Sequence, residues 1–410
     1  MKRKLFCEIS PFTYRLSMEK EILKRHVQDM LRNTRFARER TDESLPVVVY
    51  RHNSLIRRRL GNVNMQLQEN KATNLALAVK HIDGLRIHPG ETFSVWKLIG
   101  RTTKRKGYKE GLTIAKGKPS QGIGGGMCQL SNLFHWLVLH SELTITEHHH
   151  HDGLDLFPDF GRQIPFGTGT SISYNYIDYR FRNDTQNTYQ FRLWTDEEYL
   201  CGELRASKQQ PHTFHIHADN EFFSRENGVV FRNGEVYRDI IDRTSGKRLE
   251  SQLIRTNHAR VMYEKEEIIR QLLSKVFDGI REKENSPNGY HHDSDRNIYY
   301  LKQILEIDPL CEAAWYQLYC EYLYDKHDHQ KTLEVLENVY SFDPHGKRIL
   351  SKLACHYTYA DKQHDKAEEF INQLLTYHAN DPEVQRLVAT ISTYNCRHGL
   401  GSLEIIPHKN

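Results

Sequence analysis

The sequence predicts an α+β domain with a mixed or antiparallel sheet, followed by an all-α domain of helical repeats. Between about residues 70 and 240, segments with helical periodicity alternate with aromatic-rich segments of period two, as in a domain built from both helices and strands. After residue 295 the strand signals stop, and Asp-Pro pairs recur at a regular interval. With 410 residues, the chain is long enough for two or three domains.

An Asp-Pro pair marks each boundary of the predicted repeats. Asp308-Pro309, Asp343-Pro344 and Asp381-Pro382 follow one another at intervals of 35 and 38 residues, close to the 34-residue period of tetratricopeptide units. We assign residues 296–400 to tetratricopeptide-like repeats and residues 266–295 to a linker. Stacked helical hairpins offer a concave surface suited to a protein partner, and the alternative is a helical cap packed on the first domain.

Residues 1–60 form a predicted basic N-terminal helical arm. They contain 15 Lys and Arg against 7 Asp and Glu, a net charge of +8, whereas the whole chain carries +4. Within residues 18–40, apolar residues recur at helical spacing opposite basic ones, which predicts an amphipathic helix. We expect this helix to dock on the core with its charged face in solvent. The alternative is a surface for anionic lipid or nucleic acid, although no aromatic-interleaved motif supports nucleic acid.

The predicted α+β domain spans residues 61–265. A helix over residues 72–82 ends before Gly84, a common helix stop signal. The polar run 182–187 predicts a hairpin loop between two strands, and His215 and His217 are expected on the surface of a sheet. Alternating and aromatic-rich patterns predict strands at residues 85–88, 111–116, 144–146, 170–181, 189–195 and 229–236.

A glycine-rich loop leads directly into a cysteine. Gly124, Gly125 and Gly126 precede Cys128, and the apolar residues that follow have the spacing of a buried helical face. Cys128 is therefore expected in the first turn of a helix, where unpaired amides and the helix dipole favour a thiolate and lower the pKa of the thiol. Such a cysteine suits nucleophilic catalysis, with the nearby amides as an oxyanion hole. The alternative is a buried structural cysteine behind a tight turn.

Four adjacent histidines follow the predicted helix. The run Glu147-His148-His149-His150-His151-Asp152 comes after a short strand, so an antiparallel return would bring its imidazoles beside Cys128. An imidazole there would act as a general base or join the thiolate in holding a metal ion. Asp178 lies in an aromatic segment and is a candidate for orienting a histidine, because a half-buried carboxylate needs a partner.

Cysteine usage and hydropathy favour a cytoplasmic protein without a transmembrane segment. The seven cysteines are scattered, odd in number and free of CxxC pairs, which indicates reduced thiols and no structural zinc knuckle. The longest apolar stretch, around residues 133–139, is far shorter than the ~20 residues of a membrane span. The basic start is followed by acidic and polar residues instead of an apolar signal core. No cofactor is predicted.

These motifs together resemble the VanW family of bacteria. The Cys-Gln-x-Ser pattern of the family falls on Cys128, Gln129 and Ser131, and its spaced histidine pair falls on His149 and His151. The resemblance is close over residues 70–205 and weaker to about residue 265. Further matching segments, in the order of the family, are residues 74–82, 89–94, 100–103, 107–108 and 174–183.

One departure from the family pattern affects the predicted site. Many members carry Gly-Arg-Asp after the proline that aligns with Pro165, whereas this chain has Gly167-Thr168-Gly169. If those charged residues orient a substrate or a histidine, then Arg162, Asp155 or Asp159 has to replace them here.

The resemblance implies an accessory role linked to the cell envelope or to vancomycin resistance of the VanB type. One hypothesis is an enzyme in which Cys128 is the nucleophile and His149 or His151 the base, acting on a peptide, amide or acyl bond of an envelope-related substrate. Gln129 completes this predicted catalytic set. The predicted substrate-binding residues are Gly124, Gly125, Gly126, Ser131, Arg162 and Asp178.

Two alternatives to the enzyme remain. In the first, the domain is a non-catalytic binding or scaffold module, whose glycine loop and first-turn amides hold an anionic ligand while the repeats recruit a protein partner. In the second, Cys128, His149 and His151 bind a metal ion.

Overall fold

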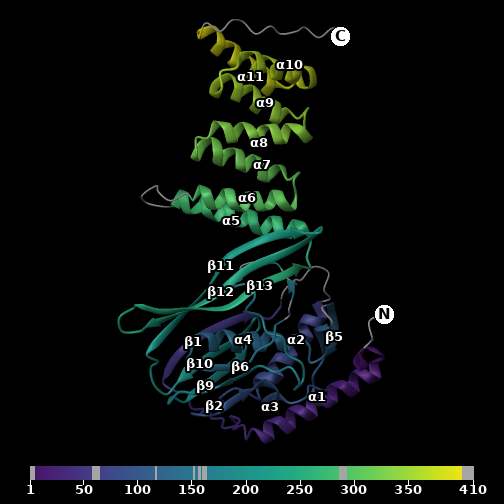
Figure 1. The fold of residues 1–410 in the computed structure, drawn as a ribbon, viewed down its shortest axis with the longest axis vertical. Helices are drawn as coiled ribbons and strands as arrows, with labels where there is room; N and C mark the ends of the chain where they lie inside the picture. The colour runs from purple at the N-terminus through teal and green to yellow at the C-terminus, as the bar shows by residue number, and fades with distance from the viewer. Residues whose placement is uncertain are drawn as a thin grey trace. The chain divides into compact units, whose positions relative to one another are not determined.

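The computed structural model describes residues 5–57, 65–115, 118–150, 153–155, 158, 164–285 and 293–398. The chain divides into two compact units, drawn in Figure 1. The first comprises Met1–Phe223 and Phe231–Met262, and the second comprises Ser224–Val230 and Tyr263–Asn410. The first unit is rich in sheet and the second is helical, as the sequence predicts.

The first unit combines short helices with many strands. Its described helices are α1 (Pro11–Leu31), α2 (Met65–Val79), α3 (Val95–Ile99) and α4 (Met127–Leu139), with short 3-10 turns η1 (Phe6–Glu8) and η2 (Lys104–Lys106). Its strands are β1 (Val47–Leu55), β2 (Arg86–Ile87), β3 (Thr92–Ser94), β4 (Glu110–Ala115), β5 (Lys118–Ile123), β6 (Thr144–Glu147), β7 (Leu154–Asp155), β8 (Arg180–Arg182), β9 (Tyr189–Thr195), β10 (Tyr199–Ala206), β11 (His212–Glu226), β12 (Val229–Asp242) and β13 (Arg248–Val261).

These strands form both antiparallel and parallel pairs. The sheet orders are β1-β10-β9-β2, β11-β12-β13-β7, β3-β8-β6 and β4-β5. Strand β7 joins β13 in parallel, whereas β10 pairs with β1 and β9, and β8 with β3 and β6, in antiparallel fashion. The mixed character predicted for the sheet region is therefore present.

Helix α4 lies in the main core of the first unit. Its sequence predicts a buried face at helical spacing, and Leu130, Phe134 and Leu137 are fully buried. The ring of Phe134 packs 5.0 Å from the rings of both Phe93 and Phe191, measured between centroids. Because strands from two different sheets supply these partners, α4 is held firmly in place.

The predicted strand over residues 170–181 and hairpin loop over residues 182–187 are corrected by the structure. Strand β8 begins only at Arg180, and before it lies a loop with one bridge, between Ser173 and Ile177. Strands β8 and β9 belong to different sheets, so the chain between them is a connection and not a hairpin. Aromatic content suggested a strand, but the amide of Thr170 donates to the side chain of Asn132 on α4 instead of to a neighbouring strand.

Helix α1 is amphipathic as predicted, but it docks through the opposite face from the one expected. Arg25 forms an ion pair with Glu147, and Asp29 forms one with Arg180. The apolar side chain of Phe12, in contrast, is 73% exposed. The expectation of a helix docked by its apolar face is therefore wrong, because buried charges on β6 and β8 require partners that only the polar face of α1 supplies.

The second unit is a series of paired helices (Figure 1). Its described elements are α5 (Lys265–Asn285), α6 (Ser294–Ile307), α7 (Glu312–Cys320), η3 (Glu321–Asp325), α8 (His329–Phe342), α9 (Lys347–Cys355), η4 (His356–Ala360), α10 (His364–His378) and α11 (Pro382–Arg397). The turns η3 and η4 are π-helical and begin at Glu321 and His356, a spacing of 35 residues. The same interval separates Asp308 from Asp343, so the repeat is visible in the backbone as well as in the sequence.

The segment assigned to a linker, residues 266–295, begins with a well-formed helix. In α5 the side chains of Ile268, Leu272 and Val276 recur every fourth residue and are at most 1% exposed. This apolar face of α5 needs a packing partner, so the segment is a structured part of the second unit. The domain boundaries themselves stay predictions.

No helix in the described part of the chain combines the length and the apolarity that crossing a bilayer requires.

Candidate functional site

One face of α4 is polar, although the rest of the helix is in the core. Cys128, Ser131, Asn132 and His135 are spaced i, i+3, i+4 and i+7, which places them on one side of the helix. We call these four residues the polar stripe. It contains the predicted nucleophile and one histidine that the sequence analysis did not select.

A short loop, residues 168–172, runs along this polar stripe. The Ile172 amide donates to the sulfur of Cys128. One turn further along α4, the amide and hydroxyl of Thr170 donate to Asn132 Oδ1 at 2.6 and 2.9 Å, and the Thr170 hydroxyl also contacts that of Ser131. Since Thr170 is only 1% exposed, the loop covers this part of the stripe.

The glycines before α4 are required by close packing. Gly126 caps the helix with φ of 102° and Gly124 has φ of 78°, both in the left-handed region that favours glycine. A Cβ on Gly125 would lie 2.2 Å from the carbonyl carbon of Gly111. Asn74 holds the same loop by donating to the carbonyl oxygen of Gly125 at 2.9 Å. The loop is thus packed against neighbouring backbone and is not open to a ligand.

The pKa of Cys128 is shifted in the direction opposite to the one predicted. Burial raises the pKa of this thiol, and the amide of Ile172 and the residue's own amide offset the shift only in part. No imidazole or carboxylate among the described residues contacts the sulfur. The expectation of a low-pKa thiolate at the helix N-terminus therefore fails, because desolvation outweighs the donation by the amides.

Gln129 and Ser131 make structural contacts. The Nε2 atom of Gln129 donates to the hydroxyl of Ser54 at 2.9 Å and to the carbonyl oxygen of Leu55 at 3.0 Å, which ties α4 to β1. The hydroxyl of Ser131 donates to the carbonyl oxygen of Cys128 at 3.0 Å. Both side chains are thus engaged in fixing α4.

The histidine run alternates between two environments. His149 hydrogen-bonds to Glu147 at 3.0 Å and belongs to a charged cluster, not to the polar stripe. His148 lies on the other side, with its ring centroid 4.0 Å from that of His135 and 4.0 Å from that of His150. The histidines that approach α4 are thus His148 and His150. His151, predicted as a catalytic residue, and Arg162, predicted to bind substrate, lie outside the described residues.

Two buried imidazole nitrogens in this cluster have no hydrogen-bond partner among the residues that the structure describes. They are the Nε2 atoms of His135 and His148, while Nδ1 of His135 contacts the Tyr179 hydroxyl at 3.2 Å. Burial lowers the pKa of His148 to about 3 and holds that of His135 well below its usual value, so both rings are neutral. The Gly169 carbonyl oxygen accepts from Nδ1 of the neighbouring His150 at 2.9 Å.

Asp178 belongs to a buried charge network and orients no histidine. Its carboxylate accepts from Arg180 Nε at 2.8 Å, from the Ser94 hydroxyl and from the Tyr179 amide. Burial raises the pKa of this carboxyl, and Arg180 opposes the shift. Arg180 in turn pairs with Asp29 at 2.6 Å. The sequence analysis was right that Asp178 needs a partner, but that partner is an arginine.

Comparisons with known proteins support the family assignment. The family described as "VanW like protein" matches residues 70–205, which contain the whole polar stripe. The chain is 36% identical over 222 residues to the "Vancomycin B-type resistance protein VanW" of Enterococcus faecalis (strain ATCC 700802 / V583), covering 54% of this chain and 80% of that protein. The chain belongs to the VanW family.

Two further matches concern parts of the chain. A Bacillus subtilis (strain 168) protein named YoaR is 33% identical over 118 residues, which is 28% of this chain and 36% of that protein. The family described as "Tetratricopeptide repeat" matches residues 323–391. This family member thus joins a VanW domain to tetratricopeptide repeats.

This VanW domain lacks the Arg and Asp of the family pattern, and of the three residues considered as replacements the structure describes one. Asp155 is buried and lies 3.7 Å from the guanidinium of Arg232, in an ion pair with β12. Asp159 and Arg162 lie outside the described residues.

One group of described residues in the VanW family member has the composition of a metal site. Ligand atoms of His215, His217 and Asp239 lie within 4.8 Å of one another, and His215 is exposed as predicted for a sheet surface. His217 and Arg248 already approach Oδ2 of Asp239, at 3.5 and 3.4 Å. The carboxylate is thus already paired with an arginine and approached by an imidazole. The predicted metal set of Cys128, His149 and His151 includes a residue that lies outside the described part of the chain, so it stays a prediction.

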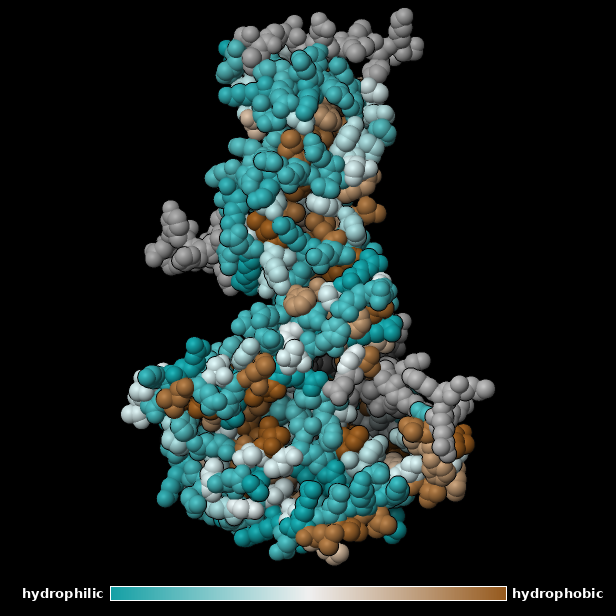
Figure 2. Space-filling model, viewed as in Figure 1, coloured by the Kyte–Doolittle hydropathy of each residue, from teal (hydrophilic) through white to brown (hydrophobic). Residues whose placement is uncertain are grey.

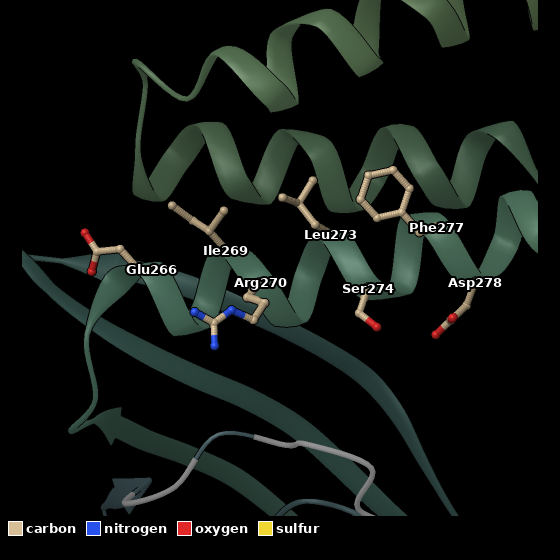
Figure 3. Close-up of a pocket in the computed structure, with 7 residues that line it drawn as sticks. All are labelled: Glu266, Ile269, Arg270, Leu273, Ser274, Phe277 and Asp278. Atoms are coloured by element: carbon tan, nitrogen blue, oxygen red, sulfur yellow. The ribbon is translucent and has the colours of Figure 1, made fainter. Parts of the chain in front are cut away.

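A shallow pocket of the second unit lies along one face of α5 (Figure 3). Its lining residues include the apolar Ile269, Leu273 and Phe277, together with Arg270 and Asp278. Phe277 is 48% exposed. All the lining residues come from this one helix, which lies outside the residues 70–205 that match the VanW family, so the polar stripe of α4 remains the candidate functional site of this VanW family member.

Proposed function

We propose that this VanW family member is a non-catalytic accessory protein of vancomycin-type resistance, in which the VanW domain binds a small ligand and the repeats recruit a protein partner. The role in resistance comes from its relative, the vancomycin B-type resistance protein VanW of Enterococcus faecalis. The observation that carries the non-catalytic assignment is the setting of Cys128, whose sulfur contacts no imidazole or carboxylate among the described residues and whose pKa is raised by burial. A thiol that stays protonated and has no adjacent base is a poor nucleophile.

The ligand site in this proposal is the pair His135 and His148. A buried polar atom without a partner costs about 1–3 kcal/mol, so two neighbouring Nε2 atoms would be stabilised by a ligand that hydrogen-bonds to them. Each of these nitrogens donates or accepts according to the tautomer of its ring, so a ligand with a hydroxyl or amide group can pair with both. Both rings are neutral, which disfavours an anion as the occupant.

The repeats supply the partner-binding half of the proposal. Tetratricopeptide arrays bind proteins on the surface formed by their stacked hairpins. In this array Arg348 lies over the ring of Tyr316, 3.6 Å from its centroid, and Lys352 lies over that of Tyr319 at 3.8 Å. The two tyrosine rings are buried beneath these cations, whereas Arg348 is exposed, which makes this basic surface a candidate contact area for a partner.

Thiol reactivity distinguishes this proposal from the enzyme hypothesis. At neutral pH we expect Cys128 to react with iodoacetamide more slowly than the exposed Cys396, because burial raises its pKa. The measurement is peptide mass spectrometry of the native chain after timed alkylation. Faster labelling of Cys128 than of Cys396 would contradict the proposal and restore Cys128 as a nucleophile.

Genetic complementation tests the proposed role in vancomycin resistance. In a strain that lacks the gene, we expect Cys128→Ser to restore the inhibitory concentration of vancomycin as fully as the wild-type chain does. His148→Ala should fail to restore it while accumulating to a normal level, since it removes the free Nε2. Unchanged vancomycin sensitivity on deletion refutes the role in resistance, and failure of Cys128→Ser refutes the non-catalytic assignment.

A further inference from the structure

Helix α1 presents an apolar face to solvent. Phe12, Met30 and Leu31 are 73%, 72% and 76% exposed. At 100° per residue, the exposed apolar side chains of α1 fall within about 100° of its circumference. These residues, which we call the apolar stripe, are Phe12, Leu16, Leu23, Val27, Met30 and Leu31. Figure 2 shows the corresponding hydrophobic surface along the lower edge of the first unit, where Figure 1 draws α1.

The opposite face of α1 is fully used in docking. Besides the pairs Arg25–Glu147 and Asp29–Arg180, Glu19 pairs with Arg101 at 2.7 Å and Asp29 with Lys97 at 3.0 Å. His26 contacts Asn175 at 3.2 Å. Because these polar bonds fix the rotation of the helix about its axis, the apolar stripe cannot turn inward without breaking them.

Exposed apolar surface of this extent marks an interaction site. Leu5 and Ile9, just before the helix, are also 65% and 63% exposed and continue the surface beyond α1. A 21-residue helix is about 31 Å long, so the stripe offers one elongated and nearly straight contact surface.

Basic residues lie in and beside the apolar stripe. By the same helical geometry, Lys20 lies within the arc of the stripe, Lys24 borders it on one side, and Arg15 lies about 60° beyond its other edge; all three are exposed. Residues 1–60 carry a net charge of +8, although the whole chain carries only +4. An apolar helical face with a basic border is the arrangement of helices that lie in the interface of anionic bilayers.

We propose that the apolar stripe of α1 binds the surface of an anionic lipid bilayer, with α1 lying parallel to the membrane plane. The apolar side chains enter the region between headgroups and acyl chains, and Arg15, Lys20 and Lys24 contact lipid phosphates. This site is separate from the polar stripe of α4 and does not depend on the proposed role of His148.

Vesicle sedimentation of the purified full chain tests the proposal. We expect the chain to pellet with phosphatidylcholine vesicles that contain about one-third phosphatidylglycerol, and to bind less to phosphatidylcholine alone. The triple variant Phe12→Ser, Leu23→Ser and Met30→Ser should lower the partition coefficient by about tenfold or more. These side chains are exposed, so folding should be retained and is checked by circular dichroism.

A matched control separates the stripe from general surface hydrophobicity. Phe222, Leu249 and Leu253 are 40%, 54% and 53% exposed on strands β11 and β13. Their replacement by serine should leave vesicle binding unchanged. Lys20→Gln with Lys24→Gln should weaken binding to anionic vesicles and leave binding to neutral ones unaltered.

Three outcomes overturn the proposal. The wild-type chain stays in the supernatant with anionic vesicles, the triple variant binds as well as wild type, or the control variant loses binding equally. If the wild-type chain is instead a dimer that the triple variant converts to monomer, and neither binds vesicles, the stripe is a contact between two copies.

Discussion

Replacing Arg180 with methionine should destabilise the first unit by about 3–5 kcal/mol, because the change removes one side of a buried charge network. Arg180 contacts Asp29, Asp178 and Glu147, and its side chain is 8% exposed. Asp29 keeps Lys97 as a partner, but Asp178 is fully buried and loses its cation. The measurement is urea unfolding followed by tryptophan fluorescence, in which Trp96 reports directly because its amide contacts Asp178.

Arg182 provides the control for this substitution. It lies two residues further along β8, pairs with Asp184 and has a side chain that is 52% exposed. Arg182→Met should change stability by less than about 1 kcal/mol, since exposed ion pairs contribute little. Equal effects of the two substitutions would contradict the assignment of Arg180 as the centre of the network.

The loss in free energy of unfolding caused by Arg180→Met should also become smaller as the pH falls from about 7 to about 5. Burial already raises the pKa of Asp178, and loss of Arg180 raises it further. The folded variant then binds a proton that the unfolded chain has released, so its stability increases on acidification. In the wild-type chain Arg180 and Lys97 hold the pKa of Asp29 below its ordinary value of 3.8 despite burial, and that contribution is lost only at still lower pH, so the wild-type chain gains nothing comparable in this range. The free energies of unfolding of the variant and the wild-type chain should therefore approach each other.

Replacing Gly125 with alanine should destabilise the first unit by about 3 kcal/mol. The new Cβ would lie 2.2 Å from the carbonyl carbon and 2.4 Å from the carbonyl oxygen of Gly111, and backbone atoms cannot move aside as a flexible side chain can. Thermal unfolding of the purified variant measures the loss. Asn74, which hydrogen-bonds to both Gly125 and Lys109, transmits any displacement of the loop to the neighbouring strand β4.

Gly169 is the matched control for Gly125. It lies in the loop that covers the polar stripe, and a Cβ there would meet no atom within 4 Å. Gly169→Ala should therefore leave the unfolding temperature nearly unchanged. If Gly125→Ala folds as stably as wild type but loses ligand binding, then the glycine loop is a binding cradle and the packing explanation is refuted.

Local sequence patterns predicted the elements whose geometry is determined within a few residues. The helix after Cys128, strand β9 over Tyr189–Thr195 and the 35-residue repeat all follow from short-range periodicity and are present. Aromatic-rich residues 170–179 misled the strand prediction, because aromatic content signals burial and not pairing. Their environment depends on Asn132 and His148, which are distant in sequence.

The sequence predicted where the candidate site lies better than it predicted which residues belong to it. The sequence placed Cys128 at the start of a helix and histidines near it, and both are found at α4. It selected His149 rather than His148, because nothing in a run of four histidines reveals which way each one points. His135 was not selected from the sequence, although its helical spacing from Cys128 and Asn132 was a usable signal.

The sequence by itself determined the helices, the repeats, the family and the amphipathic character of α1, since each depends on periodicity or on ordered motifs along the chain. Only the tertiary structure decided how those elements are used. It placed Cys128 beneath the loop 168–172, where desolvation raises the pKa of the thiol that the helix N-terminus alone would lower. It also turned α1 so that Arg25 and Asp29 face inward. Burial and charge pairing arise from residues far apart in sequence, so no local pattern records them.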